Sequence, residues 1–237
     1  MSEFKFYLDV LKALDEVGSN YMVVGAYGAS AYGLSRNTHD VDIIGVRSKR
    51  VDALAGLRPS QPGASTHFEY THIIVDLDSA ACDALALHFP PPRYNADLEH
   101  LRNAVRPSNV FTLVDGSSGG KINLSPLSRE SQYSASFETR VRRTAMYPHS
   151  NDVEFWCARP EDIIVGKLMA WQEGRSTKHP SDIYTVLNFV LSGLAGMELD
   201  VEYVARRATS IGADALRLWL AILDRVQREL DESPPPF

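Results

Sequence analysis

The chain has 237 residues, of which 44% are hydrophobic and 23% are charged, the proportions of an ordinary globular protein. Its formal net charge of -6 argues against broad, non-specific binding of nucleic acid. The two cysteines, Cys82 and Cys157, lie far apart without ligand-spaced partners, which excludes a disulfide framework and a cysteine-based zinc site. No run of eighteen apolar residues and no signal-peptide pattern occurs, so we expect a cytoplasmic protein that does not associate with membranes.

The first two thirds of the chain alternate between helical and extended patterns. Spacing of apolar residues predicts helices over 3–17, 26–32, 48–57, 79–88 and 95–105. Short apolar runs predict strands over 21–24, 41–46, 72–77, 110–114 and 121–124. The Gly- and Ser-rich turn over 115–120 is typical of a hairpin between the last two strands.

The composition changes at Arg159-Pro160, after which the chain has an almost wholly helical pattern. The predicted helices span 161–173, 181–193, 200–210 and 212–231. We therefore predict an α+β protein with an α/β core over 1–158, a C-terminal helical region over 159–232 and a frayed tail over 233–237.

Two carboxylates stand out on the predicted strand over 41–46 and at the turn before it. Asp40 and Asp42 are two residues apart, so in a strand both project to the same side, roughly 6–7 Å from each other. The two carboxylates repel each other unless a cation lies between them. Their hard oxygen ligands suit Mg²⁺ or Mn²⁺. A lone Asp-x-Asp at a strand edge is more often a solvated edge than a metal site, so the hypothesis depends on neighbouring features.

The turn after the first strand supplies one such feature. Gly25 permits close approach of the backbone, and the start of the helix that follows offers N–H groups to a phosphate. A phosphate site beside a metal pair on adjacent strands is what nucleotidyl transfer needs.

Together these residues resemble a known family, the bacterial nucleotidyltransferase-like proteins of the polymerase-beta superfamily, which are related to abortive-infection toxins and minimal nucleotidyltransferases. The opening motif of that family is matched by Gly25, Gly33, Arg36, Thr38, Asp40 and Asp42. The resemblance continues through 111–114, 121–124, 159–167 and 178–183, and so covers roughly residues 20 to 190. It implies a polymerase-beta-type core, a mixed sheet flanked by helices, followed by a helical portion.

The resemblance also implies roles for individual residues. Asp40 and Asp42 would hold the metal, and Lys167 would face the nucleotide phosphates. Further nucleotide-binding positions would be Gly25, Ala26, Arg36, Thr38 and Asp182. Three alternatives stay open: Lys167 as a surface lysine of a helix, Arg36 as a partner of Asp40, and Asp182 as a brace at a helix start.

Two positions depart from the family pattern. Ala26 stands where the family has Gly or Ser, so a hydroxyl that would contact phosphate is absent. Asn123 stands where the family has a third carboxylate, and an amide offers an oxygen to a metal but is no general base. Asp115, in the preceding turn, is a conceivable substitute that the alignment of motifs does not favour.

Two hypotheses from different classes follow. The first is a Mg-dependent nucleotidyltransferase that moves a nucleotidyl group from a nucleoside triphosphate to an acceptor hydroxyl on a protein, an RNA end or a small molecule. A toxin–antitoxin role with a protein partner would follow by analogy with relatives. The second is a catalytically degenerate relative that binds a nucleotide or a partner. A metal-dependent glycosyltransferase is disfavoured because Asp-x-Asp comes too early in the chain.

Overall fold

The computed structural model describes residues 3–34, 71–95, 99, 110–127, 133–144 and 153–232. The strands among them are β1 (Asn20–Val23), β2 (Thr71–Asp76), β3 (Phe111–Val114), β4 (Lys121–Pro126), β5 (Val141–Thr144) and β6 (Glu154–Cys157). The helices are α1 (Glu3–Glu16), α2 (Gly25–Ser30), α3 (Ser79–His88), α5 (Ser134–Glu138), α6 (Pro160–Gly174), α7 (Lys178–Leu191), α8 (Val201–Ile211) and α9 (Ala213–Glu232).

The strands form one mixed sheet in the order β3-β4-β2-β1-β6-β5. The central strand β1 pairs antiparallel with β2 and parallel with β6, and β2 pairs parallel with β4. The outer pairs β3–β4 and β5–β6 are antiparallel. The hairpin predicted around 115–120 is thereby confirmed, and so is the α+β class with a mixed sheet and a helical C-terminal portion.

The register of the sheet places the end of β1 close to Asn123. Val23 lies opposite Ile73, which lies opposite Leu124 on β4. Asn123 occupies the next row in the direction in which β1 ends, paired with His72 and Thr112. Because neighbouring strands are about 4.8 Å apart, this row is separated from the β1–α2 turn by two strand spacings, or roughly 10 Å.

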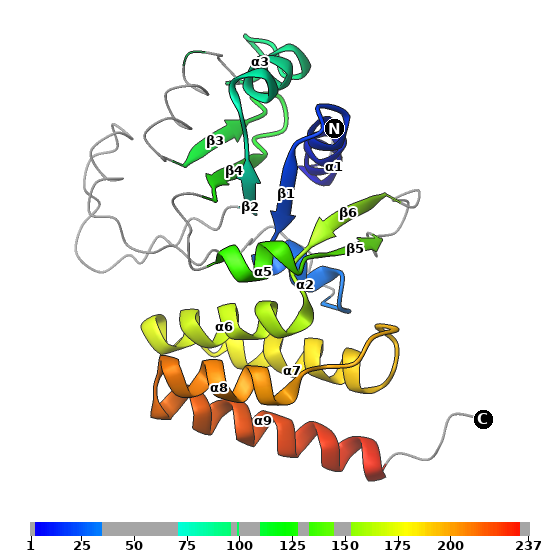
Figure 1. Ribbon diagram of the computed structural model, residues 1–237, viewed down its shortest axis with the longest axis vertical. Helices are drawn as coiled ribbons and strands as arrows, with labels where there is room; N and C mark the ends of the chain where they lie inside the picture. Colours follow the sequence, from blue (N-terminus) through cyan, green and yellow to red (C-terminus); the bar gives the residue numbers. More distant parts are fainter. Residues whose placement is uncertain are drawn as a thin grey trace.

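The four C-terminal helices lie together below the sheet in Figure 1, with α6 nearest to it and α9 farthest away. Their contacts are made by buried apolar side chains, namely Leu168, Leu187, Val204, Trp219 and Val226. Trp219 has no exposed surface, so its ring serves the packing of these helices. None of the helices that the structure describes is long and apolar enough to cross a membrane.

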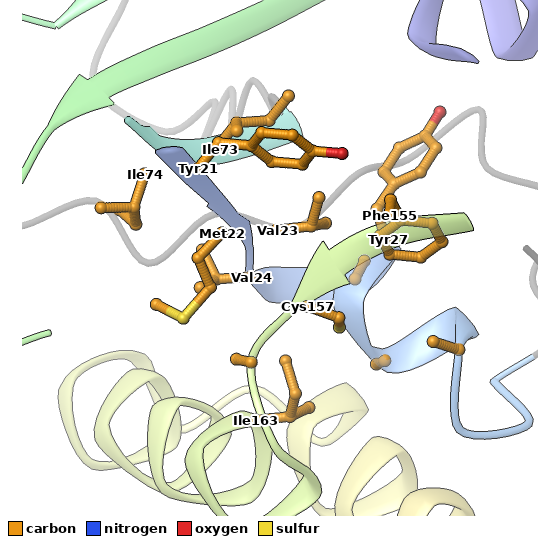
Figure 2. Close-up of a cluster of buried hydrophobic side chains, with 14 of the residues drawn as sticks. Tyr21, Met22, Val23, Val24, Tyr27, Ile73, Ile74, Phe155, Cys157 and Ile163 are labelled. Carbon is orange, nitrogen blue, oxygen red and sulfur yellow. The ribbon is translucent and has the colours of Figure 1, made fainter. Parts of the chain in front are cut away.

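A glycine brings α2 against α6. A Cβ atom added at Gly28 would lie 2.6 Å from the side chain of Ile163 on α6 and 3.2 Å from the backbone oxygen of Val23. A side chain at this position would therefore force Ile163 to shift and would press on the backbone of β1, so glycine suits the contact. Figure 2 shows Ile163 below Cys157, at the junction of β6, α2 and α6. The turn after β1 is therefore held in place directly above α6.

Two predictions about individual elements need comment. Asp182 was expected near a helix start at 181, but α7 begins at Lys178, so Asp182 lies in its second turn. Pro180 lies in the first turn of α7, where its missing N–H removes no helical hydrogen bond, so it does not delay the helix. The predicted strand over 41–46, the helix over 48–57 and the tail over 233–237 lie outside the described residues.

Candidate functional site

A small pocket lies where the end of β1 meets the first two turns of α6. It is lined by Val24, Gly25, Tyr133, Asp162, Ile163, Gly166 and Lys167. Its free space is about that of one water-sized group, so it accommodates part of a ligand and not a whole nucleotide. Two of its residues, Gly25 and Lys167, were predicted to bind nucleotide, and the fold brings them together from positions 142 apart in the sequence.

Gly25 forms the turn between β1 and α2. Its φ of 70° falls in the left-handed region, which glycine adopts without the steric cost that other residues bear. Ala26 follows within α2 and is buried. The helix spans six residues, Gly25 to Ser30, and is too short to act as a strong dipole.

Lys167 lies on α6 and is almost completely buried. Its exposed fraction is 2%, and its Nζ lies 2.8 Å from Oδ2 of Asp182 on α7, whose exposed fraction is 1%. The alternative of a surface lysine is therefore wrong: the side chain crosses from α6 to α7 inside the helical region. A lysine ammonium has three donors, and the pair with Asp182 holds one of them in a fixed direction.

Asp162 is the other charged residue of the pocket. It lies in the first turn of α6 with an exposed fraction of 7%. Its Oδ1 accepts a hydrogen bond of 2.7 Å from the hydroxyl of Tyr203 on α8. Its Oδ2 is buried and receives no hydrogen bond from any residue that the structure describes. Nε of Arg159 lies 3.7 Å from Oδ2.

Burial and the hydrogen bond to Asp162 raise the pKa of the Tyr203 hydroxyl. The phenol therefore stays protonated at neutral pH and remains a donor to Oδ1. The ring of Tyr203 also lies under the guanidinium of Arg159, with 5.5 Å between the guanidinium carbon and the ring centroid. Tyr203 thus fixes both the carboxylate and the cation that compensates its charge.

Asn123 lies on β4, outside the lining of the pocket. Its exposed fraction is 7%, and its Oδ1 accepts a hydrogen bond of 2.7 Å from the hydroxyl of Thr112 on β3. The amide oxygen keeps one lone pair beyond this bond. The register therefore places Asn123 at the same end of the central strands as the pocket. The hydrogen bond from Thr112 holds its side chain in a defined orientation.

Asp115, the conceivable substitute for the third carboxylate, is fully engaged elsewhere. Its oxygens accept hydrogen bonds from Arg93, from the backbone N–H of Ser117, and from the hydroxyls of Ser117 and Ser118. The hydrogen bond from Arg93 holds the pKa of this carboxyl well below its usual range. A carboxylate with this many donors braces the β3–β4 turn and has no lone pairs to spare for a metal.

Four of the predicted site residues, Arg36, Thr38, Asp40 and Asp42, lie outside the described residues. Within the described part of the chain, no three His, Cys, Asp or Glu side chains come together as a metal site. The metal ligands therefore remain predictions made from the sequence.

Sequence reasoning missed Asp162. An acidic residue after Arg159-Pro160 is explained by the opening of a helix, where carboxylates are favourable. The distinguishing facts, its burial and its bond to Tyr203, depend on a residue 41 positions further along the chain. No local pattern carries that information.

No family model matches the chain. A search of the curated proteins also found no match. Among solved structures, the fold is similar to that of an antigenic nucleotidyltransferase-like protein from Paracoccidioides brasiliensis, with a TM-score of 0.43 and 15% sequence identity. The alignment covers 97% of this chain and 89% of that one. The two chains differ too much for a role to be assigned to any residue from the other protein.

Proposed function

We propose that the protein is a Mg-dependent nucleotidyltransferase of the polymerase-beta type, which transfers a nucleotidyl group from a nucleoside triphosphate to an acceptor hydroxyl. The hydroxyl oxygen attacks the α-phosphorus, the α–β phosphoanhydride bond breaks, pyrophosphate leaves, and the hydroxyl proton passes to a base or to solvent. The proposal rests on the pocket in which Gly25 and Lys167 meet, just beyond the end of β1. Asn123 lies in the row of the sheet level with this turn, two strands away.

The oxygen donors of this chain suit a hard cation. Asp40 and Asp42 would hold Mg²⁺ or Mn²⁺, and the amide oxygen of Asn123 retains a lone pair that would join them. Such a cation, when bound, neutralises charge on the phosphates. Lys167 would add positive charge beside the phosphates while Asp182 keeps its ammonium group oriented.

The first experiment is a calorimetric titration of the protein with Mg²⁺ and a non-hydrolysable nucleoside triphosphate. We expect metal-dependent binding that disappears in the Asp40→Ala/Asp42→Ala variant. The matched control is Asp224→Ala/Asp231→Ala, which removes two exposed acids from α9, far from the pocket. Failure of all four common nucleotides to bind would contradict the proposal.

A second candidate is a catalytically degenerate relative that still binds a nucleotide or a partner protein. Asn123 favours it, because an amide in place of the third carboxylate cannot accept the proton of the attacking hydroxyl. The Asn123→Asp variant separates the two candidates through the release of pyrophosphate in the presence of test acceptors. A rate that rises by orders of magnitude marks the natural protein as degenerate, whereas an active natural protein supports the enzyme.

An acceptor on a protein, an RNA end or a small molecule would each serve the same chemistry. By analogy with abortive-infection relatives, we further propose a toxin role with a protein partner. Expression of the wild-type chain and of Asp40→Ala/Asp42→Ala in bacteria tests it. Growth inhibition that depends on the two carboxylates supports a toxin, and equal growth of both strains contradicts it.

A further inference from the structure

Two adjacent acids at the start of α6 are both buried, and in each only one carboxylate oxygen accepts a hydrogen bond from the described residues. Glu161, with an exposed fraction of 3%, accepts a hydrogen bond of 2.9 Å from the backbone N–H of Asp200 through Oε1. Asp162 accepts one from Tyr203 through Oδ1. The second oxygen of each receives no hydrogen bond from the described residues, and each lies within 4 Å of Nε of Arg159.

Only one of the two acids belongs to the pocket. Asp162 lines the pocket beside Gly25 and Lys167, and Glu161 does not. A ligand that enters the pocket would therefore lie beside Asp162 and not beside Glu161.

The pocket's polar groups define what fits there. A buried carboxylate oxygen without a hydrogen-bond donor loses a large part of its hydration energy, so a donor from a ligand restores a strong interaction. Arg159 supplies charge but no hydrogen bond to this oxygen, because its Nε is 3.7 Å away. A ligand that fits the pocket therefore places one O–H or N–H donor in it, in a space of about the size of a water molecule.

We propose that Oδ2 of Asp162 accepts a hydrogen bond from the nucleoside part of the bound nucleotide, through a ribose hydroxyl or an exocyclic amino group of the base. This inference rests on the proposed nucleotide-binding function and adds a residue to it. Lys167 of the same pocket lies five residues further along α6, or roughly 7.5 Å along the helix axis, on the side where phosphate charge is expected.

The test begins with ligand series on the wild-type protein, which needs no variant to fold. Calorimetry with Mg²⁺ compares a non-hydrolysable ATP analogue with its 2′,3′-dideoxy form and with the inosine form, which lacks the amino group. We expect one of the two deletions to weaken binding by about 10- to 100-fold, as for a hydrogen bond to a charged group. Which deletion does so identifies the donor.

The Asp162→Asn variant completes the cycle. Its amide keeps an acceptor for Tyr203, but it removes the charge and places either an N–H group or a weaker acceptor toward the ligand. We expect it to weaken binding of the ATP analogue by a similar factor and to leave binding of the sensitive deleted analogue nearly unchanged. Glu161→Gln is the matched control, and it should leave both affinities unchanged.

Three results would overturn this inference. If the wild type binds all three ligands equally, no nucleoside donor reaches Asp162, and the pocket holds only a water molecule. If Glu161→Gln weakens binding as much as Asp162→Asn, the effect comes from the α6–α8 contact and not from the pocket. Both outcomes leave nucleotide binding itself intact. A wild type that binds none of these ligands and none of the four common nucleotides overturns the proposed function together with this inference.

Discussion

Two buried carboxylates in different parts of the molecule show how differently a fold can treat the same group. Asp115, in the β3–β4 turn, receives hydrogen bonds from Arg93, Ser117 and Ser118 and has no exposed surface. Asp162, at the start of α6, accepts a single hydrogen bond from the described residues and lines a pocket. The first is satisfied by its own chain and stabilises a turn, whereas the second is left with an acceptor that a ligand can use.

Asp182 extends this comparison inside the helical region. It pairs with Lys167 at 2.8 Å, and both side chains are almost fully covered. Removing one partner of a buried ion pair costs more than removing one at the surface, because the buried surroundings solvate the remaining charge poorly. We therefore expect a substitution to lower the free energy of unfolding most where the carboxylate depends most completely on the partner that is removed.

The largest effect is expected for Lys167→Met, which leaves the carboxylate of Asp182 buried without its ammonium partner. We expect the free energy of unfolding to fall by about 3 to 5 kcal/mol, measured by urea denaturation at neutral pH. The double variant Lys167→Met/Asp182→Leu should regain most of this loss, since a buried ion pair can be replaced by apolar groups. A single variant as stable as the wild type would show that the pair contributes nothing.

A smaller loss, about 2 kcal/mol, is expected for Asp115→Asn. The side chain of Arg93 is 37% exposed, so water screens the interaction and the loss falls below that of the Lys167 pair. Urea denaturation of wild type and variant measures it, and Asp224→Asn on α9 serves as an exposed control.

The same carboxylate gives this loss a pH dependence. Because folding lowers the pKa of Asp115 from its usual 3.8, its contribution is complete above that value and declines as the pH falls below it. The difference between wild type and Asp115→Asn should therefore narrow below about pH 4. A difference that stays constant down to the acid transition would contradict the assignment.

The smallest effects are expected at Asp162. Tyr203→Phe removes the hydrogen bond that Asp162 accepts from the described residues and should cost about 1.5 kcal/mol, as for a bond to a charged group. Asp162→Asn keeps an acceptor for Tyr203 and should cost less than Tyr203→Phe, because Oδ2 accepts no hydrogen bond from the described residues that could be lost. Thermal unfolding of both variants measures this order. If Asp162→Asn proved as damaging as Asp115→Asn, Asp162 would be a structural carboxylate and the comparison above would fail.

Much of the secondary structure follows from local patterns. The helix predicted over 79–88 matches α3, and the four C-terminal helices were placed within three residues of their observed starts. The order of strands could not be obtained in this way. β6 packs beside β1 although 130 residues lie between them, and its alternating pattern would suit any edge of a sheet.

The site was predictable where its residues act through type and spacing. Gly25 stands out because a turn follows an apolar strand, and Lys167 was singled out by its place in a motif. That Lys167 pairs with Asp182 could not be foreseen, because the pairing depends on how α6 packs against α7. Asp162 could not be recognised as a site residue, because an acidic residue is equally expected at the start of a helix. Arg36, Thr38, Asp40 and Asp42 stay predictions.

The contact between α2 and α6 has a consequence for how the chain folds during synthesis. β1 cannot acquire its parallel neighbour until residues 154–157 exist, and Gly28 cannot be covered until Ile163 does. Although β1 can pair earlier with β2, its other side must therefore wait until more than half of the protein has been synthesised. Such delayed pairing slows folding and exposes apolar surface to other chains. Nascent chains released before Ile163 should aggregate, and those that extend through α6 should begin to resist proteases.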